Sequence, residues 1–192
     1  MKKLIKNSIA ILVMTFITLS FTTINNEKKA IKTEDSKVTW KGYKVTGSHQ
    51  GTIAIQSGSL TFSEDKLSGG EIVIDMKSIK NTEMEGEYKG KLEGHLKSND
   101  FFGVEKFPTA TLVFNDIKLV GKNSYTATGN LTIKGKTNAI TFCISVYGNK
   151  ATANLKIDRS KFDVKYGSTS FFENLKDKAI YDEFDLIADL EF

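Results

Sequence analysis

The side chains that could carry out chemistry are few, and they form no known catalytic pattern. Histidine occurs only as His49 and His95, and the single cysteine is Cys143. The sequence contains no Gly-x-Ser-x-Gly, no His-Glu-x-x-His and no glycine-rich phosphate loop after a strand. Cys143 lies in an alternating apolar run, which favours a small strand residue over a nucleophile. We therefore expect no catalytic residue.

A metal site would need both histidines together with Glu93 or Asp100. The separation of these residues along the chain matches no metal-site template. We expect no metal and no cofactor, and we expect His95 to make structural hydrogen bonds. A weaker alternative is an enzyme that acts on a hydrophobic substrate with His95 as its base.

Aromatic residues are the stronger signal. The chain has 13 Phe, 6 Tyr and 1 Trp. Phe101, Phe102 and Phe107 cluster in a loop after a predicted helix, and Phe171 and Phe172 lie in a second loop. Such rings either border the mouth of an apolar pocket or fill the ends of the fold as ordinary core. Both interpretations remain open at this point.

Under the pocket interpretation, inward-facing apolar residues and the two loops form a ligand pocket and its lid. The predicted residues are Trp40, Ile74, Met76, Leu92, Leu96, Phe101, Phe102, Phe107, Phe114, Phe142, Phe171 and Phe172. Candidate contacts for a polar head group are His95, Lys97 and Arg159. Arg159 is the only arginine, and its planar fork suits a carboxylate or phosphate. We favour a structural role for Arg159, with Asp158, Asp163 or a turn carbonyl as its partner.

From Lys37 onward, apolar and polar residues alternate with a period of two. Ile72/Ile74/Met76 and Ile140/Phe142/Ile144/Val146 are examples. This alternation predicts antiparallel strands with one buried and one solvated face, separated by turns such as Lys134–Lys136. Many short strands with close turns indicate an all-β sandwich or a closed barrel, and the pattern alone does not choose between them.

One helix is predicted over Glu83–Lys97. Thr82 and Glu85 have the spacing of a capping box. An apolar stripe is expected at Met84, Tyr88, Leu92 and Leu96. Glycines recur at 86, 90 and 94, and each costs about 1 kcal/mol relative to alanine inside a helix. They indicate close backbone contact, a soft lid, or a weak surface helix.

The N-terminus has the pattern of a secretion signal. Lys2, Lys3 and Lys6 precede an apolar stretch from Ile9 to Phe21. We predict a signal peptide over 1–22, a linker over 23–36 and one domain over 37–192, located in the periplasm or secreted. An uncleaved anchor is the alternative. Without the three signal lysines, Lys plus Arg falls from 27 to 24 against 23 Asp plus Glu, which argues against nucleic-acid binding.

The run Lys91–Pro108 resembles the signature of the YceI-like family of bacterial envelope proteins. The matching positions are His95, Leu96, Lys97, Ser98, Asp100, Phe101, Phe102, Phe107, Pro108 and Thr109. Ser36–Lys44, Leu131–Thr137 and Asp158–Val164 are also similar, so the resemblance covers roughly Lys37 to Phe192. Gly103 stands where the family usually has Asp.

The resemblance implies a lipocalin-like antiparallel β-barrel of about eight strands with one intervening helix, and a long-chain ligand. We expect non-covalent binding or carriage of a polyisoprenoid, an isoprenoid quinone or a fatty-acid derivative. The alternative is an envelope structural or stress-protection module whose barrel is filled by its own side chains. The sequence leaves open whether the protein makes transient contact with a membrane and whether it forms a homodimer.

Overall fold

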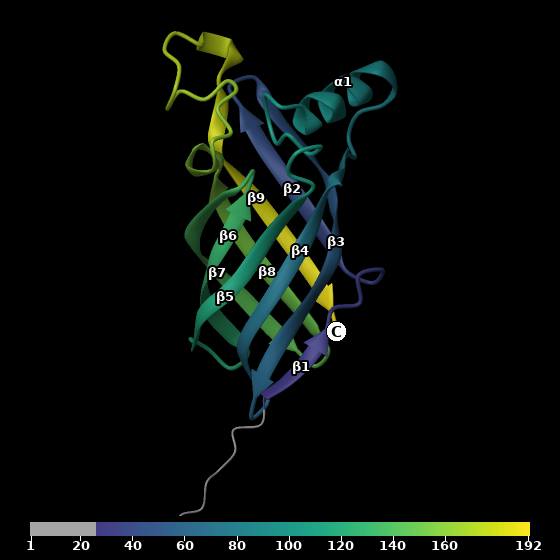
Figure 1. The fold of residues 1–192 in the computed structure, drawn as a ribbon, viewed down its shortest axis with the longest axis vertical. Coiled ribbons are helices and arrows are strands. Elements are labelled where there is room, and N and C mark those ends of the chain that lie inside the picture. The colour runs from purple at the N-terminus through teal and green to yellow at the C-terminus, as the bar shows by residue number, and fades with distance from the viewer. Residues whose placement is uncertain (1–25) are drawn as a thin grey trace, which may run out of the picture.

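The strands form one antiparallel sheet that closes on itself. The structure, a computed structural model, describes residues 26–192. The strand order is β1-β3-β2-β9-β8-β7-β6-β5-β4, and β4 also pairs with β3. This last pairing closes β2 to β9 into an eight-stranded barrel, with β1 attached outside the ring on β3 (Figure 1). The predicted all-β barrel with one helix is therefore confirmed.

The elements alternate between long strands and short turns, apart from one helix and one long loop. The strands are β1 (Asn26–Ala30), β2 (Lys37–Lys44), β3 (Gly47–Ser63), β4 (Lys66–Asn81), β5 (Thr109–Leu119), β6 (Ser124–Ile133), β7 (Lys136–Tyr147), β8 (Lys150–Asp158) and β9 (Ile180–Glu191). The helix is α1 (Gly86–Lys97), and the long loop between β8 and β9 contains short 3₁₀ turns at Arg159–Phe162 and Lys176–Lys178.

The period of two sets the strands, because every second side chain enters the barrel. In β8 the inward positions are buried and the outward ones exposed in strict alternation as far as Ile157. The predicted turn at Lys134–Gly135 is present, with positive φ at both residues. Such turns match the twist of the strands that they join. Local sequence thus specifies both the faces of the strands and the connections between them.

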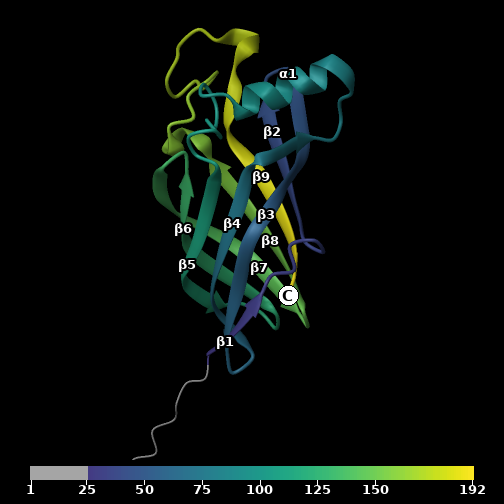
Figure 2. The same ribbon diagram turned by 45° about the vertical axis from the view of Figure 1, so that its right-hand side comes forward.

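One end of the barrel is packed solid. Leu60, Ala127, Ile144 and Leu190 are almost completely buried there. The ring centres of Phe62 and Phe192 lie 5.4 Å apart. At the other end lie α1 and the β8–β9 loop, as both ribbon views show (Figures 1 and 2). We call these the closed end and the mouth end.

Helix α1 starts later than predicted, and the expected capping box does not form. Gly86 has a φ of +60°, so the helix begins at this residue and does not extend back to Thr82. Glu85 is the N-cap and makes no side-chain capping bond. Instead Asn81, which is fully buried, accepts hydrogen bonds through Oδ1 from the backbone N–H groups of Glu83 (3.1 Å) and Met84 (2.7 Å).

The predicted apolar stripe on α1 holds only at Leu92, which packs against the core, and at Leu96. Tyr88 is 71% exposed, and Leu96 is the one buried residue of this helix. A Cβ added at Gly86, Gly90 or Gly94 would meet no atom within 4 Å. These glycines therefore do not serve close backbone contact, since nothing approaches them. The helix is a weakly attached cover held mainly by its C-terminal turn.

The N-terminal boundaries are partly revised. Asn26–Ala30, predicted as linker, forms β1 and pairs with Ser59–Ser63 of β3. The predicted signal peptide over 1–22 and residues 23–25 lie outside the described part of the chain. Among residues 26–192, no helix has the length and hydrophobicity needed to cross a membrane.

Candidate functional site

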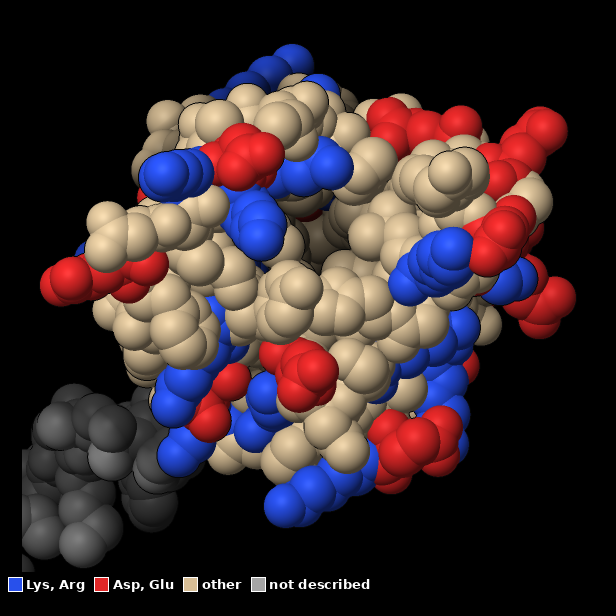
Figure 3. All heavy atoms as spheres, turned by 90° about the horizontal axis from the view of Figure 1, so that it is seen from above, with Lys and Arg blue, Asp and Glu red and all other residues tan. Residues whose placement is uncertain are grey.

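The barrel contains an apolar cavity beneath α1 and the Phe101–Phe102 loop. Its volume is about 130 Å³, counted at the centres of water-sized spheres. Side chains from every barrel strand except β7, together with the C-terminal turn of α1, form the wall. Of the predicted pocket residues, those that line it are Trp40, Ile74, Met76, Leu96, Phe101 and Phe102. Viewed onto the mouth end, the surface is hollowed near its centre (Figure 3).

A second cavity of about 60 Å³ continues the first toward the closed end. Phe114 and Phe142 line it, with their ring centres 5.2 Å apart. The residues that line both cavities are Val38, Ile74, Ala110, Leu131, Ile157 and Leu186. The two spaces therefore adjoin and form one apolar column that ends at the packed closed end.

Small side chains at inward positions create this space. Ala110 lines both cavities, and Ala153 and Ala188 line the second. Gly42 lines the first cavity, and a Cβ added there would meet nothing within 4 Å. Sequence reasoning missed these four residues. The signal was present, because each one is in phase with the apolar positions of its strand.

The loop after α1 turns its aromatic rings inward. Gly103 has a φ of +59°, and its N–H donates to the Ser98 carbonyl (2.7 Å). Phe101 and Phe102 are both buried, with ring centres 4.9 Å apart in an edge-to-face arrangement. They close part of the mouth end above the first cavity, which we call the upper cavity.

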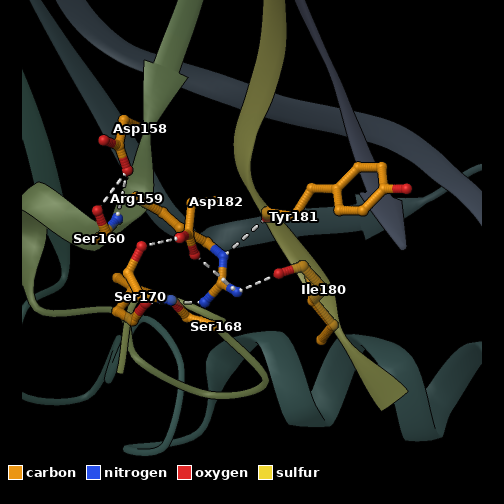
Figure 4. Close-up of polar contacts among 9 residues, drawn as sticks. Asp158, Arg159, Ser160, Ser168, Ser170, Ile180, Tyr181 and Asp182 are labelled. Carbon is orange, nitrogen blue, oxygen red and sulfur yellow. Dashed lines mark hydrogen bonds and ion pairs between the residues drawn. The ribbon is translucent and has the colours of Figure 1, made fainter. Parts of the chain in front are cut away.

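Arg159 lies in the cavity wall, where it links the β8–β9 loop to the start of β9 (Figure 4). Its side chain is 2% exposed. The guanidinium donates to the carbonyls of Val164 (2.7 Å), Ile180 (2.9 Å) and Tyr181 (3.2 Å), and Nη2 lies 3.4 Å from Oδ1 of Asp182. These contacts indicate the structural role favoured from the sequence.

Burial lowers the pKa of Arg159 from its ordinary value, while the charges of Asp182 and Asp158 oppose that shift. Asp182 is itself held by Ser170, whose Oγ donates to Oδ2 at 2.6 Å. The only cation in the cavity lining is therefore already hydrogen-bonded and paired within the described residues. A contact between Arg159 and a ligand head group stays a prediction.

Several predicted site residues lie outside the cavity lining. Leu92 packs against the core from α1, and a Cβ on Gly135 would lie 3.0 Å from the Phe107 ring. His95 contacts the ring of Tyr166, with centres 4.3 Å apart. Lys97 is also outside the lining. Nε2 of His95 is buried and has no hydrogen-bond partner among the described residues, so this atom does not make the structural hydrogen bond expected from the sequence. The head-group contacts of His95 and Lys97 stay predictions.

Phe171 and Phe172 differ most from expectation. They are 42% and 49% exposed, and neither lines a cavity. Their backbone N–H groups both donate to the carbonyl of Ser168, which forms a tight local turn. The rings of this pair therefore face outward, unlike those of Phe101 and Phe102.

The described part of the chain contains no metal cluster. No three His, Cys, Asp or Glu side chains among residues 26–192 gather into a group that could hold a metal ion. Cys143 is exposed on the outer face of β7. The feature that the geometry offers for function is the apolar binding space.

A closed eight-stranded barrel with an apolar column and a single covering helix has counterparts among known proteins. The YceI-like domain matches residues 30–192. The chain belongs to the YceI-like domain family.

UPF0312 proteins are similar to this chain. One from Pseudomonas putida is 30% identical over 108 residues, which are 56% of this chain and 53% of the relative. One from Pseudomonas aeruginosa is 34% identical over 91 residues, 47% of this chain and 45% of the relative. The chain spans about half the length of the curated relatives it matches.

Solved structures show the same YceI-like fold at low sequence identity. Burkholderia cenocepacia BcnA is 24% identical with a TM-score of 0.66, covering 83% of this chain and 98% of that one. The Campylobacter jejuni YCEI protein is 18% identical with a TM-score of 0.54, covering 95% and 92%. A domain from Saccharophagus degradans, described as polyisoprenoid-binding, is 15% identical with a TM-score of 0.57, covering 84% and 95%.

Proposed function

We propose that this YceI-like protein is exported and binds a long-chain amphiphile non-covalently inside its barrel, without a chemical step. The ligand class is a polyisoprenoid, an isoprenoid quinone or a fatty-acid derivative. The observation that carries the proposal is the apolar column, which begins under the hollow at the mouth end and continues past Phe114 and Phe142. The polyisoprenoid-binding name of the Saccharophagus degradans neighbour supports the same ligand class. The lysine-then-apolar pattern of the first 22 residues supports export.

Apolar burial is sufficient to drive such binding. Removing one isoprene unit of about five carbons from water contributes roughly 3–4 kcal/mol as an upper bound. A few units therefore exceed the cost of ordering a chain and losing its translational freedom, which is of the order of 4–15 kcal/mol. Affinity then depends on how much chain the column accepts, and polar groups are needed only for orientation.

The polar end of the ligand would remain at the mouth end. Tyr43, Tyr181 and Arg159 lie in that part of the lining. Deeper in the wall, the indole N–H of Trp40 is buried and has no hydrogen-bond partner among the described residues. Buried donors are rarely left unpaired. A ligand oxygen that reached Trp40 would find a free donor there.

Cavity filling at Gly42 tests the proposal. Gly42 has an ordinary backbone conformation, and its missing side chain would project into open space beside the upper cavity. We expect Gly42→Leu to fold normally and to weaken binding of geranylgeraniol by about tenfold or more, because the added side chain occupies space that the ligand needs. Gly90→Leu is the matched control, since Gly90 also has open surroundings but lies on exposed α1.

Two measurements decide the outcome. Isothermal titration compares the three proteins, and mass spectrometry of an organic extract identifies any lipid that copurifies. Equal binding by the Gly42→Leu and native proteins would show that the column is not the binding site. Absence of both a copurified lipid and geranylgeraniol binding would reject the proposal and favour the filled structural barrel.

A further inference from the structure

Exposed aromatic side chains gather at one end of the barrel. Among the described residues, the exposed aromatics are Tyr88, Tyr147, Tyr166, Phe171, Phe172 and Tyr181. All but Tyr147 belong to α1, the β8–β9 loop or the first residues of β9, which lie at the mouth end. Tyr147 is the last residue of β7, at the closed end. Single exposed aromatics are ordinary on a protein surface, but their collection around one opening is not.

This collection is continuous with the opening of the cavity. We define the mouth rim as Val45, Tyr166, Phe171, Phe172 and Tyr181, all of which are exposed. Tyr181 belongs to both features, because it also lines the upper cavity. The segments of the rim are joined by backbone hydrogen bonds. The N–H of Val45 donates to the carbonyl of Ala179 (3.2 Å), and the N–H of Ile180 donates to the carbonyl of Gly167 (2.8 Å).

The rim is held in place by the buried polar contacts beneath it. Arg159 joins the loop to β9 through the carbonyls of Val164, Ile180 and Tyr181 (Figure 4). Ser170, next to Phe171, donates to Asp182 at 2.6 Å. In Figure 4 the ring of Tyr181 points away from the guanidinium. The exposed rings therefore lie on an anchored loop.

We propose that the mouth rim docks on the surface of a phospholipid bilayer and places the cavity opening against the membrane. This inference rests on the proposed function. A long-chain amphiphile resides in a bilayer, and each methylene that passes through water on the way to the cavity costs free energy. A mouth pressed against the membrane shortens or removes that exposure. Aromatic side chains with one polar edge, such as Tyr, favour the region of the lipid head groups.

The charge of the rim indicates which membrane it fits. Between Val164 and Tyr181 the positive residues are Lys165, Lys176 and Lys178, and the negative ones are Glu173 and Asp177. Three against two leaves a net charge of +1 on this loop, and Lys44, next to Val45, adds one further positive residue to the rim. Lys165 is in addition paired with Asp163 (2.9 Å) and lies over the Phe171 ring (5.2 Å). A nearly neutral aromatic rim is complementary to a zwitterionic bilayer and does not select for anionic lipid.

The geometry leaves this end accessible. Strand β1, which begins at Asn26, pairs with the end of β3 and lies at the closed end of the barrel (Figure 1). Helix α1, at the same end of the barrel as the cavity opening, carries the exposed ring of Tyr88. Exposed aromatic residues therefore lie at the end that carries the cavity opening, as expected for a surface that enters the head-group region of a bilayer.

The test uses phosphatidylcholine vesicles and a variant in which both rim phenylalanines become serine. We expect the native protein without its predicted signal peptide to float with the vesicles. F171S/F172S should bind them at least about tenfold more weakly, because two exposed rings no longer enter the bilayer. Binding should change less than about twofold between low salt and roughly 0.5 M salt, since it does not depend on screened charges. Tyr147→Ser, an exposed aromatic at the closed end, is the matched control and should bind like the native protein.

A second measurement separates this inference from the proposed function. Geraniol, a short prenol that dissolves without vesicles, should bind the native protein and F171S/F172S with equal affinity. The docking proposal is overturned if F171S/F172S floats like the native protein, if flotation requires anionic lipid, or if the rim instead joins two copies in vesicle-free solution. Failure of geraniol to bind either protein would instead count against the cavity as the ligand site.

Discussion

The guanidinium carbon of Arg159 lies 5.4 Å from the centre of the Phe101 ring. Phe101 belongs to the loop after α1, and Arg159 to the turn that follows β8. Their contact joins the two segments that cover the mouth end of the barrel. Because Arg159 also binds three carbonyls of the β8–β9 loop and β9, one buried cation organises the whole covered end.

We expect Arg159→Ala to destabilise the protein strongly. The change leaves Asp182 without its buried partner and removes donors from three carbonyls. Breaking a buried ion pair by removing one partner costs about 3–5 kcal/mol. Urea unfolding measures the loss, and Lys161→Ala, an exposed neighbour, should stay within about 0.5 kcal/mol of the native protein. A small loss at Arg159 would mean that its contacts are not structural.

The two phenylalanine pairs should respond differently to truncation. Phe101 is buried, so Phe101→Ala should lower the free energy of unfolding by about 3 kcal/mol. Phe171 is exposed, so Phe171→Ala should change it by less than about 0.5 kcal/mol. Chemical denaturation of both variants checks this, and equal losses would contradict the assigned burial. A loss at Phe101 does not argue against a ligand, because this ring is both core and cavity wall, which makes Gly42 the sharper probe.

The hydrogen bond between Tyr43 and Asp185 should make stability depend on pH. Tyr43 Oη donates to Oδ2 of Asp185 at 2.6 Å. This bond lowers the pKa of Asp185 below its ordinary value of 3.8; burial opposes the shift, and Lys156 adds to it. A carboxyl with a lowered folded-state pKa contributes stability above its unfolded pKa, and that contribution is lost as the pH falls through the folded value.

Tyr43→Phe removes the largest cause of that shift. The variant should be less stable than the native protein at about pH 7, and the difference should shrink as the pH falls below 3.8, where Asp185 becomes protonated. Urea unfolding at several pH values measures the difference, with Tyr147→Phe as the exposed control. A difference that stays constant down to about pH 3 would show that Asp185 is not responsible.

Much of the barrel was predictable because burial of one strand face imposes a period of two on the sequence. The turn between β6 and β7 was also predictable from its residues, because the positive φ at Gly135 favours glycine. The choice of a barrel over a sandwich came from the family resemblance, since both folds have the same alternation. The start of α1 was not predictable from the capping pattern, because Asn81, from the end of β4, holds the N–H groups of Glu83 and Met84 in a turn that precedes the helix.

The sequence by itself determined the period of the strands, the scarcity of catalytic side chains and the family to which the chain belongs. Only the tertiary structure decided which aromatic pair faces inward, because Phe101–Phe102 and Phe171–Phe172 are the same dipeptide in similar loops. Phe101 and Phe102 line a cavity whose other walls come from strands distant in the chain, whereas Phe171 and Phe172 line neither cavity. The packed interior, which is non-local, therefore separates the residues that line the cavity from those that face outward.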